Sequence, residues 1–302
     1  MNAAPLETSS QMPDLVEHFK VVSQRSRYFV TVTTKELGGG QRTHGIDFGG
    51  TMRGCVTMTV QTPNAAWASD PRFAFFERDK HLALISWIGY GRRCNLTNDM
   101  PGGEGTRKMV QAAMTFVLQR YPWITAFKLT DASTFVCVES FEMNLADVSW
   151  VTHGKTYYER HFGASLLEPN LAAAYAADTA RLNGSLPEFA DFAQLARLSS
   201  VPRDKIELLK KAHSGAATYR DLFARLKAEC GARYCDALHP WLAGFVVTMS
   251  RHPYWSSYWV IPAANVRQQP LEIAVSDPIP QDRFQKGGRK RKSNGHFTVD
   301  DL

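Results

Sequence analysis

One run of residues in this 302-residue chain stands out for its chemistry: Gly102, Gly103, Glu104, Gly105 and Thr106. The apolar stretch 81–90 before the run predicts a strand, and the periodic stretch 106–121 after it predicts a helix. The first turn of a helix has free backbone N–H groups and the positive end of a dipole, and glycines let a ligand approach the backbone closely. Since Arg107 and Lys108 add positive charge, the sequence predicts a site for an anion such as phosphate or pyrophosphate.

The spacing of these glycines does not fit two common phosphate-binding motifs. No Lys-Ser/Thr pair follows Gly105 as a Walker A loop requires, and the run does not match the dinucleotide pattern G-x-G-x-x-G. The alternative is a tight turn that binds no ligand.

The elements around the run predict an α/β fold. After the helix, 123–129 has the character of a second strand, so strand, glycine loop, helix and strand form a βαβ unit. Alternating segments at 28–34 and 52–61 predict further strands. The stretch 81–90 is apolar on both faces, which is typical of a central strand covered on both sides.

The N-terminal third contains three less regular segments. Residues 1–27 predict a loose leader followed by a short helix, because Leu15, Phe19 and Val22 share one helical face. Residues 37–51 contain six glycines and predict a loop. Residues 73–77 predict a strand that pairs with 81–90 in a hairpin.

The order of these elements and three short motifs resemble the GNAT family (Gcn5-related N-acetyltransferases). The window Met100–Gly105 is similar to that family's Gln/Arg-x-x-Gly-x-Gly/Ala loop, with Met100 in the first position. The segment Tyr158–Gly163 resembles its Tyr-x-x-x-Gly-Phe ending, with the last two residues exchanged. The motif Lys155–Glu159 is close to one in GNAT-like proteins encoded by large DNA viruses of eukaryotes. The resemblance covers residues 52–167, with 254–262 as a closing strand.

This resemblance implies binding of acetyl-CoA or another acyl-CoA and direct acyl transfer to an amine, of a small molecule or a protein, that the sequence does not identify. The backbone of the glycine run would hold the pyrophosphate, with Arg107 beside it. Direct transfer needs an acid for the leaving thiolate and a base for the amine. The resemblance assigns the acid to Tyr158, and the base candidates are Asp131, at the end of the second βαβ strand, and His153, before the Tyr158 helix.

Each of these residues also has a structural interpretation. Tyr157 and Tyr158 can pack with one ring in the core and one facing water. Asp131 can be a turn or cap residue, and His153 a loop residue. No metal site is expected, because Cys230, Cys235 and nearby histidines lack usual zinc spacing and fit buried thiols in a helical core.

Three departures from the family favour a second hypothesis. Met100 replaces a polar residue, no substrate-binding helices are predicted in 37–51, and a large helical block, 168–253, has no counterpart in the resemblance. About twenty extra residues, 132–152, also precede the Tyr158 helix, which indicates either a different acceptor or an inactive enzyme. The alternative is therefore a non-catalytic GNAT-like protein that acts as a virion component or as an assembly or interaction module.

The C-terminal half predicts a helical insertion. Residues 168–253 are rich in Ala and Leu at helical spacing, and 254–266 contains strand character again. We therefore expect a GNAT-like α/β domain at 28–167, whose mixed, mostly antiparallel sheet is closed by a strand that follows the insertion. The insertion would contact an acceptor or a protein partner. Residues 267–302 predict a flexible basic tail.

Charge and cysteines bear on compartment and partners. The net charge is +6, with five Lys or Arg between Lys286 and Lys292, so the tail predicts nuclear targeting or weak nucleic-acid contact, with a merely solubilising tail as the alternative. Five scattered cysteines, an odd number, predict no disulfide framework. Neither a signal peptide nor a membrane span is predicted. We expect a protein of the cytoplasm or nucleus of a host cell, or one associated with virions.

Overall fold

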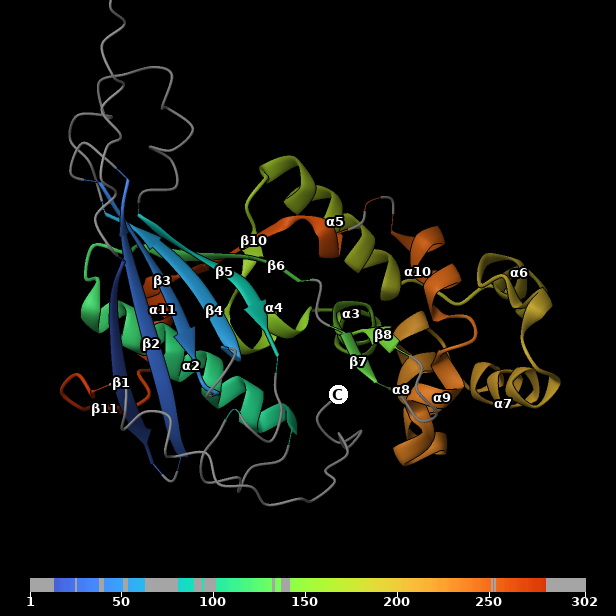
Figure 1. Ribbon diagram of the computed structural model, residues 1–302. Coiled ribbons are helices and arrows are strands. Elements are labelled where there is room, and N and C mark those ends of the chain that lie inside the picture. Colours follow the sequence, from blue (N-terminus) through green and yellow to red (C-terminus); the bar gives the residue numbers. More distant parts are fainter. Residues whose placement is uncertain are drawn as a thin grey trace, which may run out of the picture.

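The computed structural model describes residues 14–24, 26–37, 41–50, 54–62, 81–89, 94, 102–131, 134–136, 142–250, 252 and 254–280. The strands of its main sheet are β1 (Leu15–Ser23), β2 (Ser26–Glu36), β3 (Arg42–Phe48), β4 (Val56–Gln61), β5 (Leu82–Ile88), β6 (Ala126–Thr130), β9 (Ser165–Leu166), β10 (Tyr258–Pro262) and β11 (Ala274–Val275). They lie in the order β11-β1-β2-β3-β4-β5-β6-β10-β9 (Figure 1). Only β5 and β6 pair in parallel among these strands. The structure thus confirms an α/β fold with a mixed, mostly antiparallel sheet.

The predicted N-terminal helix is wrong, because this segment is strand β1. It pairs with β2 along its whole length, from Leu15 opposite Thr34 to Ser23 opposite Ser26. Phe19 and Val21 are both buried, which is the alternation of a strand. A spacing of three and four can occur in a strand by chance, and the long antiparallel ladder with β2 decides the outcome.

The glycine-rich segment also forms a strand. Residues 42–48, which we predicted to lie in a loop, form β3 between β2 and β4. Ile46 and Phe48 point to the buried face, and Gly45 lies on the other face. Most of the glycines of this segment flank the strand instead of interrupting it. The predicted hairpin strand at 73–77 lies outside the described residues.

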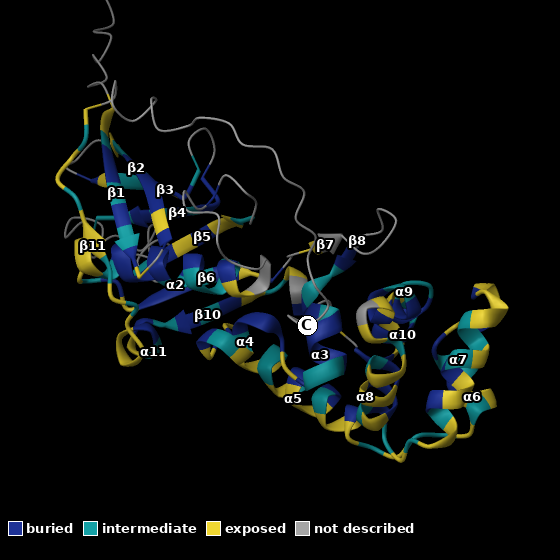
Figure 2. Ribbon diagram, turned by 90° about the horizontal axis from the view of Figure 1, so that it is seen from below, coloured by how far each residue is buried: buried dark blue, intermediate teal, exposed yellow. Residues whose placement is uncertain are grey.

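Helix α2 (Gly102–Arg120) covers one face of the sheet and connects β5 to β6, which confirms the βαβ unit. The Phe116 ring of α2 lies 5.9 Å from the Phe19 ring and 6.3 Å from the Phe48 ring. On the other face of β5, Leu84 and Trp87 are 40% and 60% exposed (Figure 2). The prediction that this strand is covered on both faces is therefore wrong.

Between β6 and β9 the chain forms a small hairpin and two helices: β7 (Thr134–Val136), β8 (Glu142–Asn144), α3 (Leu145–His153) and α4 (Tyr157–Phe162). The block that follows contains α5 (Pro169–Leu182), α6 (Phe189–Leu195), α7 (Arg203–Ser214), α8 (Tyr219–Cys230), α9 (Tyr234–Leu238) and α10 (Leu242–Met249). Its core is aromatic: the Phe223 ring lies 5.6 Å from Trp241 and 5.3 Å from Phe245. The block extends away from the sheet in Figure 1.

The C-terminal part is more ordered than predicted. Strand β10 closes the sheet between β6 and β9, but it begins at Tyr258, and Tyr254–Ser256 is a single 3₁₀ turn. Helix α11 (Ala263–Gln268) follows, and β11 pairs with β1 at the edge of the sheet. Residues 267–280 therefore belong to the fold, and the predicted tail from 281 to 302 lies outside the described residues.

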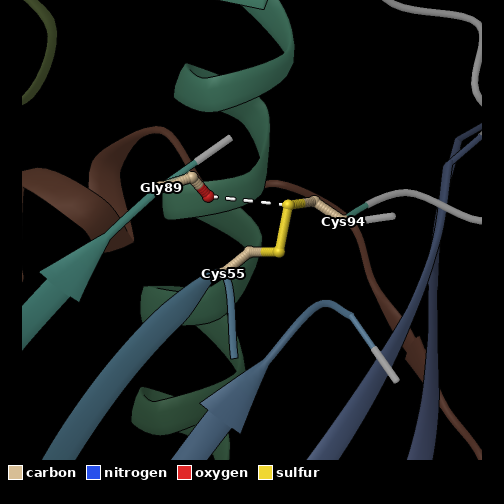
Figure 3. Close-up of a disulfide and its surroundings, with 3 residues drawn as sticks. All are labelled: Cys55, Gly89 and Cys94. Carbon is tan, nitrogen blue, oxygen red and sulfur yellow. Dashed lines mark hydrogen bonds between the residues drawn. A yellow bond between two sulfur atoms is a disulfide. The ribbon is translucent and has the colours of Figure 1, made fainter. Parts of the chain in front are cut away.

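The cysteines also differ from expectation. Cys55 and Cys94 form a disulfide, with their Cα atoms 5.7 Å apart (Figure 3). Cys235 is disulfide-bonded as well, whereas Cys230 is a free thiol. The prediction against disulfides is therefore wrong. Cys55 and Cys94 are 39 residues apart in the sequence, and the pairing of β4 with β5, which the sequence does not show, brings them together.

Candidate functional site

The glycine run lies within the first turn of α2 and not in a loop before it. The helix begins at Gly102, four residues earlier than predicted, so Arg107 and Lys108 lie in its second turn. Lys108 forms an ion pair with Glu104 at 2.8 Å, one helical turn earlier. The side chains of Glu104 and Lys108 therefore neutralise each other. The N–H groups of the first turn remain without acceptors inside the helix, as at any helix start.

The parallel pair β5–β6 separates before β5 ends at Ile88. The two strands pair over three residue pairs, from Leu82–Ala126 to Leu84–Lys128, and the pairing ends there. Beyond Lys128, β6 continues to pair with β10 on its other side. Ligands of open α/β sheets bind beyond the carboxyl ends of parallel strands, where neighbouring strands separate. The first turn of α2 begins from this same edge of the sheet.

Positive charge from two other helices gathers near α2. Burial, together with the smaller effects of the charges of Arg160, Arg107 and His153, lowers the pKa of His161 in α4 to about 4. These four side chains therefore come close enough to interact, although they belong to α2, α3 and α4. His161 is neutral at pH 7, so Arg107 and Arg160 supply the positive charge of this group. We did not single out Arg160 and His161 from the sequence.

Tyr158, the acid candidate, lies in the core. It is 2% exposed, its ring lies 5.4 Å from that of Tyr157, and it stacks on Phe162 at 6.2 Å. Tyr157 is 5% exposed, so the alternative in which one of the two rings faces water is also wrong. Helix α4 is fixed locally by a capping box, in which Thr156 and Glu159 bond to each other's backbone N–H groups.

Asp131, the first base candidate, is a buried carboxyl at the end of β6, with 0% exposure. Burial raises its pKa to about 7; the Thr156 hydroxyl opposes this shift and the charge of Asp147 adds to it. Thr156 is close enough to act on the pKa, but neither oxygen of Asp131 has a partner in good hydrogen-bond geometry among the described residues. A carboxyl with this pKa can gain or lose a proton near neutral pH.

Asp147 in the first turn of α3 is a second carboxyl of the same kind, and sequence analysis missed it. Burial raises its pKa to about 7 as well. It lines a cavity of about 10 Å³, room for about one water molecule. The other lining residues are Ala146, Trp150, Thr156, Tyr175, Val246, Ser250 and Tyr254. The signal that could have located it is the helix start at Asn144, whose side chain accepts hydrogen bonds from the N–H groups of Ala146 and Asp147.

Two further carboxylates beside this cavity have hydroxyl donors. The Tyr175 hydroxyl donates to Glu159 Oε2 at 2.8 Å, and the Tyr254 hydroxyl donates to Asp178 Oδ2 at 2.6 Å. Arg181 reaches Asp178 at 3.5 Å. These bonds join α4, α5 and the turn before β10, so they connect the helical block to the sheet through polar contacts.

His153, the second base candidate, is the last residue of α3 and not a loop residue. Its carbonyl oxygen accepts a hydrogen bond of 3.1 Å from Arg220 in α8. Gly154 follows in the left-handed conformation that ends the helix. Tyr158, Asp131 and His153 thus lie around one point, the α3–α4 junction at Thr156. The structure brings the three candidates to the same region, and His161 of α4 interacts with Arg107 in the second turn of α2.

No protein-family model matches the chain, and no curated protein and no solved structure is significantly similar to it. The described residues contain no group of three or more His, Cys, Asp or Glu side chains that could hold a metal ion. Within the same residues, no helix is both long enough and apolar enough to cross a bilayer.

Proposed function

We propose that the protein is an acyl-CoA-binding N-acyltransferase of GNAT-like architecture, with acetyl-CoA or another acyl-CoA as donor and an amine as acceptor. The observation that carries the proposal is the βαβ unit, in which the β5–β6 pairing ends at Leu84–Lys128 and α2 follows β5 with three glycines in its first turn. This arrangement combines an opening between parallel strands with free helix N–H groups.

The charges support an anionic donor. Arg107 lies one turn into α2, and Arg160 and His153 act on the same histidine, His161, as Arg107 does. The pyrophosphate of an acyl-CoA would lie against the first-turn N–H groups of Gly102 to Gly105, with Thr106 and Arg107 beside it. Glu104 would contribute its backbone only, because its side chain is paired with Lys108.

An acyl-CoA supplies an activated thioester carbonyl when it is bound. Of the base candidates, Asp131 has the most suitable environment, because its pKa of about 7 lets it accept the proton of an attacking amine near neutral pH. The charge of Asp147 contributes to this raised pKa, so it tunes the base. Tyr158 would donate to the leaving sulfur only if acyl-CoA binding opens a path to its buried hydroxyl.

Calorimetric titration of the full chain with acetyl-CoA tests the proposal. Arg107→Ala should weaken binding about tenfold, which corresponds to ~1.4 kcal/mol for the loss of a charged contact. Arg203→Ala is a matched control, because Arg203 is an exposed arginine near the start of another helix, α7. The absence of binding at millimolar acetyl-CoA would overturn the proposal, and equal losses in both variants would overturn the site.

One observation favours a second candidate, a non-catalytic virion, assembly or interaction protein. Cys55 and Cys94 form a buried disulfide, and Cys235 is also disulfide-bonded. Disulfides persist in secreted proteins and on virion surfaces and are rare in reducing compartments. Presence of the protein in purified virus particles at fixed stoichiometry, with its disulfides intact and without acetyl-CoA binding, would favour this candidate over the enzyme.

A further inference from the structure

The Cys55–Cys94 disulfide ties the start of β4 to the end of β5 (Figure 3). The N–H of Gly89, just after β5, donates to the Cys55 carbonyl at 2.7 Å. The Gly89 carbonyl oxygen lies 3.5 Å from the Cys94 sulfur. Both half-cystines are buried, with 8% and 5% exposure. The disulfide therefore fixes Cys94 at the edge of the sheet where β5 ends.

The disulfide also packs beside the second turn of α2. A Cβ atom placed on Gly49 would lie 3.0 Å from the Cys94 carbonyl oxygen, 3.3 Å from Cys55 Cβ and 3.5 Å from Met109 Sδ. Met109 is 0% exposed. Gly49 has a φ of 74°, so it reaches a conformation that a larger residue would rarely adopt at this crowded point. Packing is thus continuous from the disulfide to α2.

The first turn of α2 depends on such anchoring. Three of its first four residues are glycines, and glycine is the least favourable helix residue after proline. Local propensity therefore gives this turn little stability, and contacts in the tertiary structure must hold it. The Glu104–Lys108 ion pair supplies one contact within the helix.

The disulfide shortens the chain that leads into this turn. Gly102 follows Cys94 by eight residues and Gly89 by thirteen. Among the residues that the structure describes, Cys94 is the last one before α2 and is fixed by the disulfide, and the described residue before it is Gly89. The entropy of fixing both ends of a connection rises with its length, and this difference in length changes the equilibrium by about twofold. Loss of packing around Gly49 and Met109 would add to this factor.

We propose that the Cys55–Cys94 disulfide is a redox control on the first turn of α2, so that reduction loosens this turn and weakens the binding of an anionic ligand there. Reduction by a dithiol breaks the S–S bond and yields two thiols, while the dithiol is oxidised to its own disulfide. The ligand part rests on the proposed function; the coupling of the disulfide to the turn does not.

Amide hydrogen exchange of the full chain tests the coupling directly. The N–H groups of residues 106–109 bond to the carbonyl groups of residues 102–105, so they report on the first turn. Oxidised protein is compared with protein reduced by dithiothreitol and alkylated, and with the Cys55→Ala/Cys94→Ala variant. Cys235→Ala is the matched control, because it removes another bonded cysteine, located in α9.

We expect these amides to exchange at least about twofold faster in the reduced protein and in the double variant. Amides in the middle of α8 should keep their exchange rates in the reduced protein and in the double variant. In the Cys235→Ala variant, the amides near α2 should also keep their exchange rates. Affinity for acetyl-CoA should fall by at least the same factor. Unchanged exchange at 106–109, or equal acceleration throughout the chain, would overturn the redox control. If oxidised protein does not bind acetyl-CoA, the proposed function fails, and the exchange experiment still decides whether the disulfide controls the turn.

Discussion

Replacing Asp131 by Asn should remove a pH-dependent loss of stability. The folded protein holds a proton on this carboxyl up to a pKa of about 7, whereas an unfolded chain releases it near 3.8. A raised pKa in the folded state means that stability is greatest below pH 4 and declines as the pH rises towards 7. Above pH 7 the folded protein must hold a buried negative charge or take up a proton from solvent.

The magnitude follows from the shift. Three pKa units at about 1.36 kcal/mol each give a loss of up to ~4 kcal/mol between pH 4 and pH 8. An Asn at position 131 has nearly the same shape and no charge, so this loss disappears. Its amide group will lack hydrogen-bond partners as the carboxyl does, and this cost is the same at every pH. The expected result is therefore a change in slope: relative to wild type, Asp131→Asn gains up to ~4 kcal/mol as the pH rises from 4 to 8.

Urea unfolding followed by tryptophan fluorescence at pH 4, 6 and 8 measures this slope. Asp191→Asn is the control, because Asp191 is an exposed carboxylate in α6 and its replacement removes the same formal charge. A variant whose stability follows the wild-type pH profile would refute the reasoning. Such a result would mean that water reaches Asp131 or that a cation compensates it.

Two further predictions concern the junctions of the fold. Gly154→Ala should destabilise the protein by more than about 1 kcal/mol, because φ is 69° and a Cβ would overlap an Arg220 nitrogen. Gly231→Ala has a φ of 50° and nothing within 4 Å of the added Cβ, so it should cost less by thermal unfolding. Equal costs would exclude the contact with Arg220 as the cause. Removing the disulfide with Cys55→Ala/Cys94→Ala should lower the free energy of unfolding by ~4 kcal/mol, which is the chain-entropy value for a loop of this length. Denaturant titrations measure this change, and a loss below about 1 kcal/mol would contradict the chain-entropy account.

The elements that the sequence predicted well are those whose signal is local. The helix that became α2 has a regular apolar period and a proline directly after Tyr121, and the strands on both sides have apolar cores. Strand β10 followed from β-branched and aromatic residues after a helical block. In each case neighbouring residues along the chain carry the preference, so no knowledge of distant contacts was needed.

The failures occurred where a distant partner decides the structure. Residues 15–23 have an ambiguous period, and pairing with β2 makes them a strand. The cysteines at 55 and 94 are bonded only because β4 and β5 are neighbours in the sheet. Residues 267–280 carry little periodicity of their own, and the free edge of β1 provides the partner for β11.

For the candidate site, residue types were visible in the sequence and their properties were not. Tyr158, Asp131 and His153 could be named from the motifs, and the structure places all three around Thr156. Whether a carboxyl is a solvated cap or a buried group with a pKa of about 7 depends on what covers it. Here Thr156 before α4 and Asp147 of α3 lie beside Asp131, and the free energy of its charge is set by such distant packing, because desolvation acts through every atom that excludes water.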